Sequence, residues 1–402
     1  LFAGTELAAY FSIDGGEHWI RLAGVPTIAV RDIAIQRRES DVVLGTFGRG
    51  FYVLDDYSPL RHVTRERLGD PALLFPVKDA LSYVERSRLG GRNGRGSQGA
   101  SFYAAPNPPF GAVFTWYLKD GLKSRKEARR RTEKKALEND ETVPYPSLEE
   151  LRAEDTELDP KVFLVVRDDT GAVVQRVPGK QGKGIHRVAW NLRYPSAEPV
   201  RLDDDEERPP WWSPPKGPLA LAGTYTVELV QRVDGTETPL AGPESFDVVP
   251  LALATFAAAD PADVLAFSRR AARLQRAVSG TSRVAGELAK RIRHLRAAYA
   301  NTPDATVGIL EGLEALRRRL IDLRTRVDGD ATRRKHDVPR PRSIRSRIDD
   351  VVGSQLGVTS APTQTQRDVL AETETMFGAA HADLGALVRD LEALEARMEG
   401  LG

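Results

Sequence analysis

The stretch SIDGGEHW at residues 12–19 lies within a series of short β-forming runs and has the spacing Ser-x-Asp-x-Gly-x-x-Trp. Around it, residues 1–57 alternate these runs with glycine-containing turns: LFAGT, AAYFS, HWIRL, VRDIAIQ, DVVLGTF and GFYVLDD. Strands of about five residues joined by tight turns are typical of repeated antiparallel sheets, such as the blades of a propeller. We therefore expect residues 1–57 to be β-sheet throughout.

The 12–19 stretch resembles the Asp-box turn of sialidase-like and sortilin-like (Vps10-type) β-propellers. The resemblance implies that Ser12, Asp14, Gly16 and Trp19 hold a turn. Asp14 accepts hydrogen bonds from turn amides, Gly16 takes a backbone conformation closed to other residues, and the Trp19 indole packs into the blade. This motif marks a fold and not a reaction, because it repeats around such propellers, mostly far from the axial ligand site.

The similarity extends over most of the chain and is weaker after residue 255. The matching stretches, in the family's order, are GTFGRGFYVLDDYSPLR (45–61), PPFGAVFTWYL (108–118), VPYPSLEELRAED (143–155), a D-x-x-G turn (168–171), GIHRVAWNLR (184–193) and AGTYTVELV (222–230). They resemble the C-terminal part of large bacterial proteins with WD40, YVTN or BNR repeats, often labelled glycosyl hydrolase. The resemblance implies an extracytoplasmic protein, in the periplasm, at the cell surface or secreted.

The β-runs of residues 1–57 divide unevenly between blades. If the Asp-box joins the third and fourth strands of a blade, the runs up to HWIRL finish one blade. VRDIAIQ, DVVLGTF and GFYVLDD then begin another blade that lacks its last strand. Proteins rarely leave a long hydrophobic edge strand unpaired. We therefore expect upstream propeller blades, or another chain, to complete the propeller, and residues 1–57 not to fold alone.

A second β-rich region follows a transition. Residues 58–109 are expected to be a linker, with prolines and a glycine-rich basic loop at 89–101 that favours a surface loop over a phosphate cradle. Residues 110–250 have strand periodicity without alternating helices, which excludes a parallel α/β fold. They are expected to form an immunoglobulin- or fibronectin-like β-sandwich with Trp190 in its core.

Two insertions interrupt the expected sandwich. The first, at 119–160, is helix-forming and changes from basic to acidic, and it lacks the interleaved aromatics of a nucleic-acid-binding arm. We therefore expect it to be a solvated helical excursion and not a binding arm. The second, at 201–218, has an acidic run without the spacing of a calcium loop. It also contains Trp211 and Trp212, which either seal the loop onto the sandwich or form a platform for a glycan or protein partner.

Residues 257–402 are rich in Ala, Leu, Arg and Glu at helical spacing and predict an α-helical bundle. The first helix is expected to begin at Pro261 after the N-cap Asp260, with an interruption at Gly280, and the second to open at a Pro-Asp pair. The sequence therefore predicts a multidomain chain, β first and α afterwards.

Few residues in the sequence carry catalytic chemistry. The chain has no cysteine and six histidines, none at the H-x-x-x-H spacing of a metal site, so we expect no cofactor and no metal. Candidate catalytic residues on the propeller loops are Glu6, Arg31, Asp32 and Arg49, because glycoside hydrolysis needs paired carboxylates and sialidases use an arginine cluster.

The formal net charge of +1 does not indicate a nucleic-acid partner. No apolar run approaches the roughly 18 residues of a membrane span.

Two functions are compatible with these observations. The first is a non-catalytic C-terminal region of an exported sortilin-like β-propeller protein, acting in protein or glycan binding or assembly. The alternative is a sialidase-like glycoside hydrolase whose active site lies mostly in upstream blades. The family label rests on fold, so it predicts architecture better than catalysis.

Overall fold

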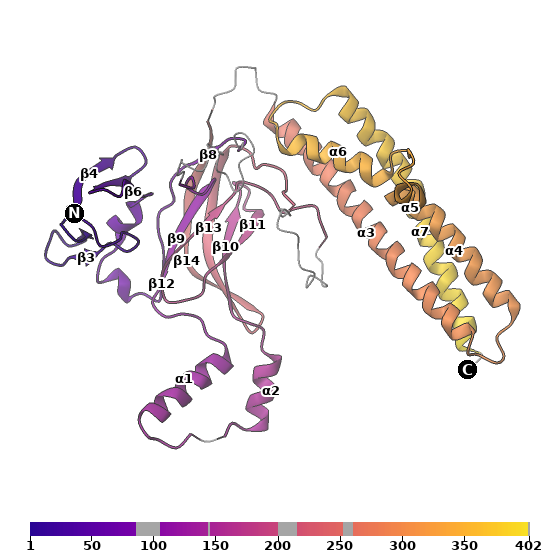
Figure 1. The fold of residues 1–402 in the computed structure, drawn as a ribbon, viewed down its shortest axis with the longest axis horizontal. Helices are drawn as coiled ribbons and strands as arrows, with labels where there is room; N and C mark the ends of the chain where they lie inside the picture. The colour runs from indigo at the N-terminus through magenta and orange to yellow at the C-terminus, as the bar shows by residue number, and fades with distance from the viewer. Residues whose placement is uncertain (86–104, 144, 200–214, 252–259, 401–402) are drawn as a thin grey trace. The chain divides into compact units, whose positions relative to one another are not determined.

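The computed structural model describes residues 1–85, 105–143, 145–199, 215–251 and 260–400 (Figure 1). Its contacts divide the chain into two compact units, one of residues 1–192 and 222–251 and one of residues 193–221 and 252–402. The first unit contains all the named β-strands, and the second contains the C-terminal helices. The order of β before α is therefore as the sequence predicts. No described helix is a candidate membrane span.

Two small antiparallel sheets open the chain. Their strands, in chain order, are β1 (Phe2–Gly4), β2 (Ala9–Phe11), β3 (Ile20–Arg21), β4 (Val30–Gln36), β5 (Asp41–Thr46) and β6 (Phe51–Leu54). The strand orders are β1-β2-β3 and β4-β5-β6. The two sheets meet where the Val30 amide donates to the Thr5 carbonyl at 2.9 Å. A small buried cluster including Ala9, Val42 and Leu44 lies between them.

Two further sheets form the rest of the β unit. Their strands are β7 (Ala72–Leu74), β8 (Ala80–Ser82), β9 (Ala112–Leu118), β10 (Lys161–Arg167), β11 (Val173–Gly179), β12 (Gly184–Trp190), β13 (Gly223–Val233) and β14 (Thr236–Pro250). One sheet has the order β11-β10-β13-β14-β8 and the other β12-β9-β7. All pairs are antiparallel except β8 with β14.

Aromatic side chains pack between these two sheets. Trp190 on β12 lies edge-on to Tyr225 on β13 with ring centroids 5.4 Å apart, and Phe114 on β9 lies 5.6 Å from Phe246 on β14. Trp190 is 1% exposed, so its predicted place in the core is confirmed. Gly111 allows the chain to pass close to this core, because an added Cβ would lie 1.9 Å from the Trp190 carbonyl oxygen.

The region expected to be a linker contributes strands to both sheets. β7 pairs with β9, and β8 pairs in parallel with the end of β14. Leu73, Leu74 and Phe75 are buried. Each strand has only three residues and prolines lie between and beside them, so the segment has no strand periodicity long enough to recognise. Residues 58–85 therefore belong to the fold, whereas the glycine-rich loop at 89–101 lies outside the described residues.

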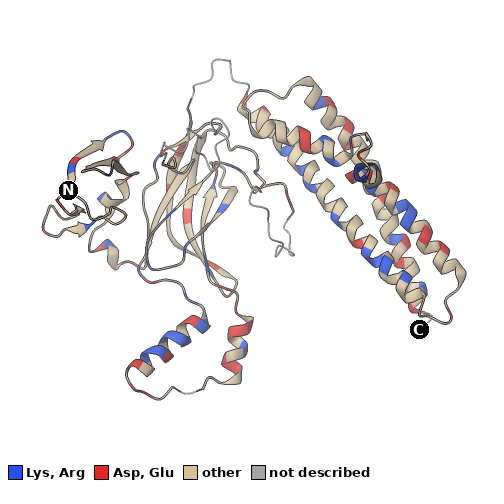
Figure 2. Ribbon diagram, in the orientation of Figure 1, with Lys and Arg blue, Asp and Glu red and all other residues tan. Residues whose placement is uncertain are grey.

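Between β9 and β10 the chain forms two exposed helices, α1 (Arg125–Glu138) and α2 (Leu148–Thr156), as the sequence predicts. Ser124 and Ser147 each close a capping box with a glutamate three residues on. Neither helix buries a residue. Arg129 instead joins them through both carboxylate oxygens of Glu154, and Figure 2 shows that α1 is mostly basic.

The second unit is built on four long helices and one short one, α3 (Pro261–Tyr299), α4 (Val307–Asp328), α5 (Ala331–Lys335), α6 (Ile344–Leu356) and α7 (Gln364–Glu399). Helix α3 begins at Pro261 after the Asp260 cap, as predicted, but it continues through Gly280. The N-cap position of helix α4 is Thr306, whose side chain makes no capping hydrogen bond, and the helix does not open at the Pro-Asp pair. The buried stripes of the four long helices meet in a single hydrophobic cluster.

Residues 193–199 and 215–221 contact the helices of the second unit. The Arg193 guanidinium donates to the Leu356 carbonyl at 3.1 Å, and Arg276 donates to the Ser196 and Ala197 carbonyls. Arg269 lies 4.1 Å above the Tyr194 ring. The expected β domain at 110–250 is therefore interrupted by a segment that belongs to the helical unit, because arginines on α3 and the end of α6 hold its backbone.

Candidate functional site

The turn at residues 12–19 is held by the side chains of Ser12 and Asp14. The Ser12 hydroxyl accepts the Gly16 amide at 2.8 Å and donates to Asp14 Oδ1 at 2.8 Å. Asp14 Oδ1 also accepts the His18 amide at 3.0 Å. Gly16 has a φ of +104°, a conformation that disfavours any residue with a Cβ. The sequence roles expected for Asp14 and Gly16 match this geometry, and Ser12 contributes as much as Asp14.

Trp19 differs from its expected role as a buried plug, because it is 43% exposed. It precedes the two-residue strand β3, which is an edge of its sheet in the described chain. Trp19 lies over Gly16, where an added Cβ would be 3.7 Å from the ring and 3.5 Å from Leu1. Leu1 is itself 65% exposed, and the described chain covers the indole only in part.

His18 and Glu17 lie beside Asp14, and potential ligand atoms of the three residues fall within 4.8 Å of one another. The turn already uses Asp14, whose second oxygen is 2.8 Å from His18 Nδ1. The His18 amide, then the Ser12 hydroxyl and the His18 ring, hold the pKa of Asp14 well below its usual range. The Arg65 guanidinium lies 3.1 Å from His18 Nε2 and adds positive charge. This group is therefore a structural element of the turn, and we assign no metal to it.

The candidate catalytic residues lie on β4 and on the turns that join β1 to β2 and β5 to β6. Among the described residues, no hydrogen bond or ion pair links Glu6, Arg31, Asp32 or Arg49 to one another. Asp32 accepts the amide of the next residue, and the Arg31 guanidinium lies 5.5 Å above the Phe47 ring. Paired carboxylates across a sugar site are the minimum for glycoside hydrolysis. The described hydrogen bonds and ion pairs therefore do not connect these four residues in a catalytic arrangement.

The sheet β4-β5-β6 has apolar residues on both faces. On one face, Val42 and Leu44 of β5 are 0% and 1% exposed. On the other face, the strand register aligns Ala34, Val43 and Val53 across the sheet. The same face carries Phe51, opposite Gly45. Phe51 is 79% exposed and Val53 54%, so this second face, which we call the outer face, is uncovered in the described chain.

Polar contacts join the end of β6 to the larger sheets of the same unit. Arg187 on β12 donates to the carbonyls of Asp55 and Asp56 at 2.7 and 2.8 Å. Burial raises the pKa of the Asp55 carboxyl and the nearby Asp41 raises it further, while Arg187 opposes the change. Lys78 makes a second connection, to the Glu39 carbonyl at 2.6 Å. These contacts hold one end of the sheet, and Phe51 and Val53 on its outer face stay exposed.

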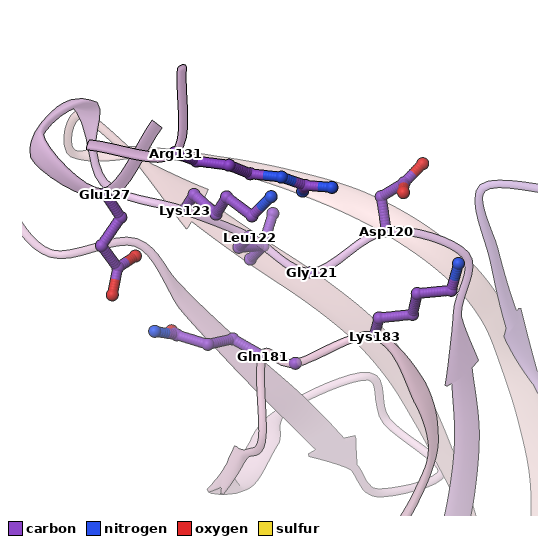
Figure 3. Close-up of a pocket in the computed structure, with 9 residues that line it drawn as sticks. Asp120, Gly121, Leu122, Lys123, Glu127, Arg131, Gln181 and Lys183 are labelled. Atoms are coloured by element: carbon purple, nitrogen blue, oxygen red, sulfur yellow. The ribbon is translucent and has the colours of Figure 1, made fainter. Parts of the chain in front are cut away.

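A pocket of about 490 Å³ lies between residues 120–123, the first part of α1 and the turn at 181–183 (Figure 3). Lys123, Arg131 and Lys183 line it, together with Asp120 and Gln181. The sequence predicts a solvated basic insertion and does not predict this pocket, because Lys183 is far from Lys123 in the sequence. The signal that could have found it is the pair of glycine-containing basic turns, KDGLK and KQGKG, that flank β9 and β12.

The remaining candidates, Trp211 and Trp212, lie outside the described residues, as does the acidic run beside them. Comparison with known proteins found no match to the chain among family models, curated proteins or solved structures.

Proposed function

We propose that this chain is a non-catalytic binding and assembly module, in which residues 1–57 form the terminal blades of a sortilin-like β-propeller. An immunoglobulin- or fibronectin-like sandwich and a helical bundle then follow. The observation that carries the proposal is the sheet β4-β5-β6, which is covered on one face and carries the exposed apolar side chains of Phe51 and Val53 on the other. The sequence resemblance at 12–19 and 45–61 supports the same reading.

The physical argument concerns the outer face. A sheet with one solvated face alternates apolar and polar residues, whereas a sheet buried on both faces has nearly continuous apolar runs. Strands β5 and β6, with the sequences DVVLGT and FYVL, are of the second kind. A blade in a propeller packs between two neighbouring blades, and this packing would explain why apolar side chains lie on both faces of the sheet. We propose that another blade, from upstream residues or from another chain, covers Phe51 and Val53.

The non-catalytic part of the proposal rests on the contacts of Glu6, Arg31, Asp32 and Arg49, among which the described chain has no hydrogen bond or ion pair. Binding of a protein or glycan partner is then the function left to the module. The proposed extracytoplasmic location rests on the sequence resemblance alone.

Cysteine labelling tests the proposal, because the natural chain has no cysteine. Val53→Cys would place one thiol on the outer face, and Lys135→Cys on exposed α1 would be the matched control. The thiol reaction rate would be measured for the purified 402-residue chain and for the protein isolated intact from its natural host. We expect position 53 to react at least about tenfold more slowly in the isolated native protein, because burial excludes the reagent.

The control thiol at position 135 should react at similar rates in both preparations. Equal rates at position 53 in the two preparations would mean that nothing covers the outer face in the natural protein. The assembly proposal would then be wrong.

A further inference from the structure

We propose that the pocket between residues 120–123 and 181–183 binds a small hydroxylated molecule through its phosphate or sulfate group. The inference does not depend on the proposed propeller, because every residue of the pocket lies in or beside β9, β12 and α1. It concerns a region that the sequence assigns to a solvated excursion.

The two chain segments that form the pocket are held together by their backbones. β9 ends at Leu118, which pairs with Gly184 at the start of β12, so the segments leave neighbouring strands side by side. The Leu122 amide donates to the Gln181 carbonyl at 2.9 Å. Gly121 permits this approach, because an added Cβ would lie 3.0 Å from the backbone nitrogen of Lys183 and 3.1 Å from the backbone oxygen of Gln181.

Three cationic side chains line the pocket without forming an ion pair to any described residue: Lys123, Arg131 and Lys183. Two arginines on α1 outside the pocket are paired. Arg125 pairs with Asp234 at 2.8 Å, and Arg129 with Glu154 at 2.6 Å. The carboxylates of Asp234 and Glu154 are therefore paired with Arg125 and Arg129 and not with the cations of the pocket. The cations of the pocket remain available to a ligand.

The two acidic residues of the lining do not neutralise this cluster. Glu127 belongs to the capping box of α1, where its carboxylate accepts the Ser124 amide at 3.1 Å. In Figure 3, the Arg131 and Lys123 side chains extend in one direction and the Glu127 carboxylate points in another. Asp120 makes no ion pair with a described residue. Its carboxylate lies at one end of the pocket in Figure 3.

The composition of the pocket selects the ligand class. A guanidinium group binds tetrahedral oxyanions through two parallel hydrogen bonds, and lysines add point charges. The Gln181 amide and the Asp120 carboxylate suit hydroxyl groups. The pocket volume of about 490 Å³ is larger than the oxyanion alone requires, so the molecule that carries it also fits.

Calorimetric titration of the full chain tests the proposal at low and at physiological ionic strength. The probes are glucose 6-phosphate, glucose 6-sulfate and neutral glucose. We expect saturable one-to-one binding of at least one ester, weakened by salt because the lining is exposed, and none of glucose. The stronger ester identifies whether phosphate or sulfate is preferred.

Variants locate the binding. Lys123→Ala, Arg131→Ala and Lys183→Ala should each weaken binding about fivefold or more, because each removes a charge-assisted hydrogen bond. Lys135→Ala removes one charge from the same helix outside the pocket and should leave affinity unchanged. Gly121→Ala changes no charge but separates the two segments, so it should also weaken binding; circular dichroism of each variant checks that the fold is kept.

Two results would overturn the proposal. One is the absence of saturable binding of either ester to the natural sequence. The other is equal weakening by Lys135→Ala and by the pocket variants, which would show attraction to the general positive charge of α1 and not a site.

Discussion

The helical unit and the N-terminal sheets solve the problem of burial in different ways. The four long helices share one cluster of 22 buried residues, whereas the sheets of residues 1–57 share a cluster of five. The helices therefore bury their main apolar stripes against one another, and the sheets leave exposed apolar side chains on one face. Correspondingly, Phe51 and Val53 are exposed on the sheet, while the apolar stripes of α3, α4, α6 and α7 face inward. This difference is the reason why we propose a partner for the N-terminal sheets and not for the helices.

The largest effect is expected from opening a cavity in the helical unit. Leu313 on α4 is 0% exposed, and Leu313→Ala should lower the free energy of unfolding by about 2–5 kcal/mol. Urea unfolding followed by the helical circular dichroism signal measures the change. Ile321→Ala on the same helix, where the side chain is 48% exposed, should cost less than Leu313→Ala. Equal losses would mean that the helices do not share a packed core.

A similar loss of stability is expected in the larger β-sheets, which also share a buried core. Gly111 has a φ of +106° and lies against the Trp190 backbone, so Gly111→Ala should destabilise this unit by about 2–4 kcal/mol through strain and overpacking. Tryptophan fluorescence follows the loss, because Trp116 and Trp190 are buried. The control is Gly69→Ala, which meets no atom within 4 Å. A wild-type midpoint for Gly111→Ala would contradict the close approach.

A smaller, local effect is expected in the 12–19 turn. Ser12→Ala removes the acceptor of the Gly16 amide and the donor to Asp14, which should cost about 1 kcal/mol. Hydrogen exchange at the Gly16 amide should accelerate correspondingly. Glu17→Ala changes a neighbouring side chain that makes no hydrogen bond within the described turn, and it should leave the exchange of that amide unchanged. Unaltered exchange in Ser12→Ala would mean that Asp14 alone holds the turn.

The pH dependence of the same turn follows from Asp14. Its pKa is lowered in the folded chain, chiefly by the His18 amide, so its contribution to stability is present above the unfolded value of about 3.9 and is lost as pH falls through the lower folded value. An NMR titration of the Asp14 carboxyl should therefore have its midpoint below the ordinary value. Ser12→Ala should move that midpoint upward. An ordinary midpoint in the natural chain would contradict the turn geometry.

The smallest stability change is expected on the outer face. Phe51→Ser alters a side chain that is 79% exposed and should change the free energy of unfolding by no more than about 0.5 kcal/mol. It should nevertheless reduce binding of a hydrophobic dye to the 402-residue chain, because it removes exposed apolar surface. Val42→Ser, on the covered face, should be strongly destabilising. A large loss of stability in Phe51→Ser would show that this face is already packed.

The sequence predicts most of the elements but not all of their contacts. Helix-forming runs, caps such as Asp260 and the Asp168 turn are local properties, and they appear where expected. β7 and β8 were missed because they are short and are defined by distant partners on β9 and β14. Exposure of Trp19 could not be predicted, since burial depends on elements that contact it.

The candidate site was predicted less well, for the same physical reason. Asp14 and Gly16 act within one turn, so local chemistry identifies them. The cationic pocket depends on the register between β9 and β12, which brings Lys123 and Lys183 together from distant positions. Such a cluster cannot be recognised from the sequence, because its residues are far apart in the chain and the strand register is not known beforehand.

Hydrogen exchange of the monomeric 402-residue chain tests most directly the claim that the N-terminal sheets need outside contact. We expect the amides of β4 and β6 to exchange far faster than those of the buried stripes of α3 and α7, because open sheets have low local stability. Protection of residues 30–54 equal to that of α7, in a chain shown to be monomeric, would contradict the account.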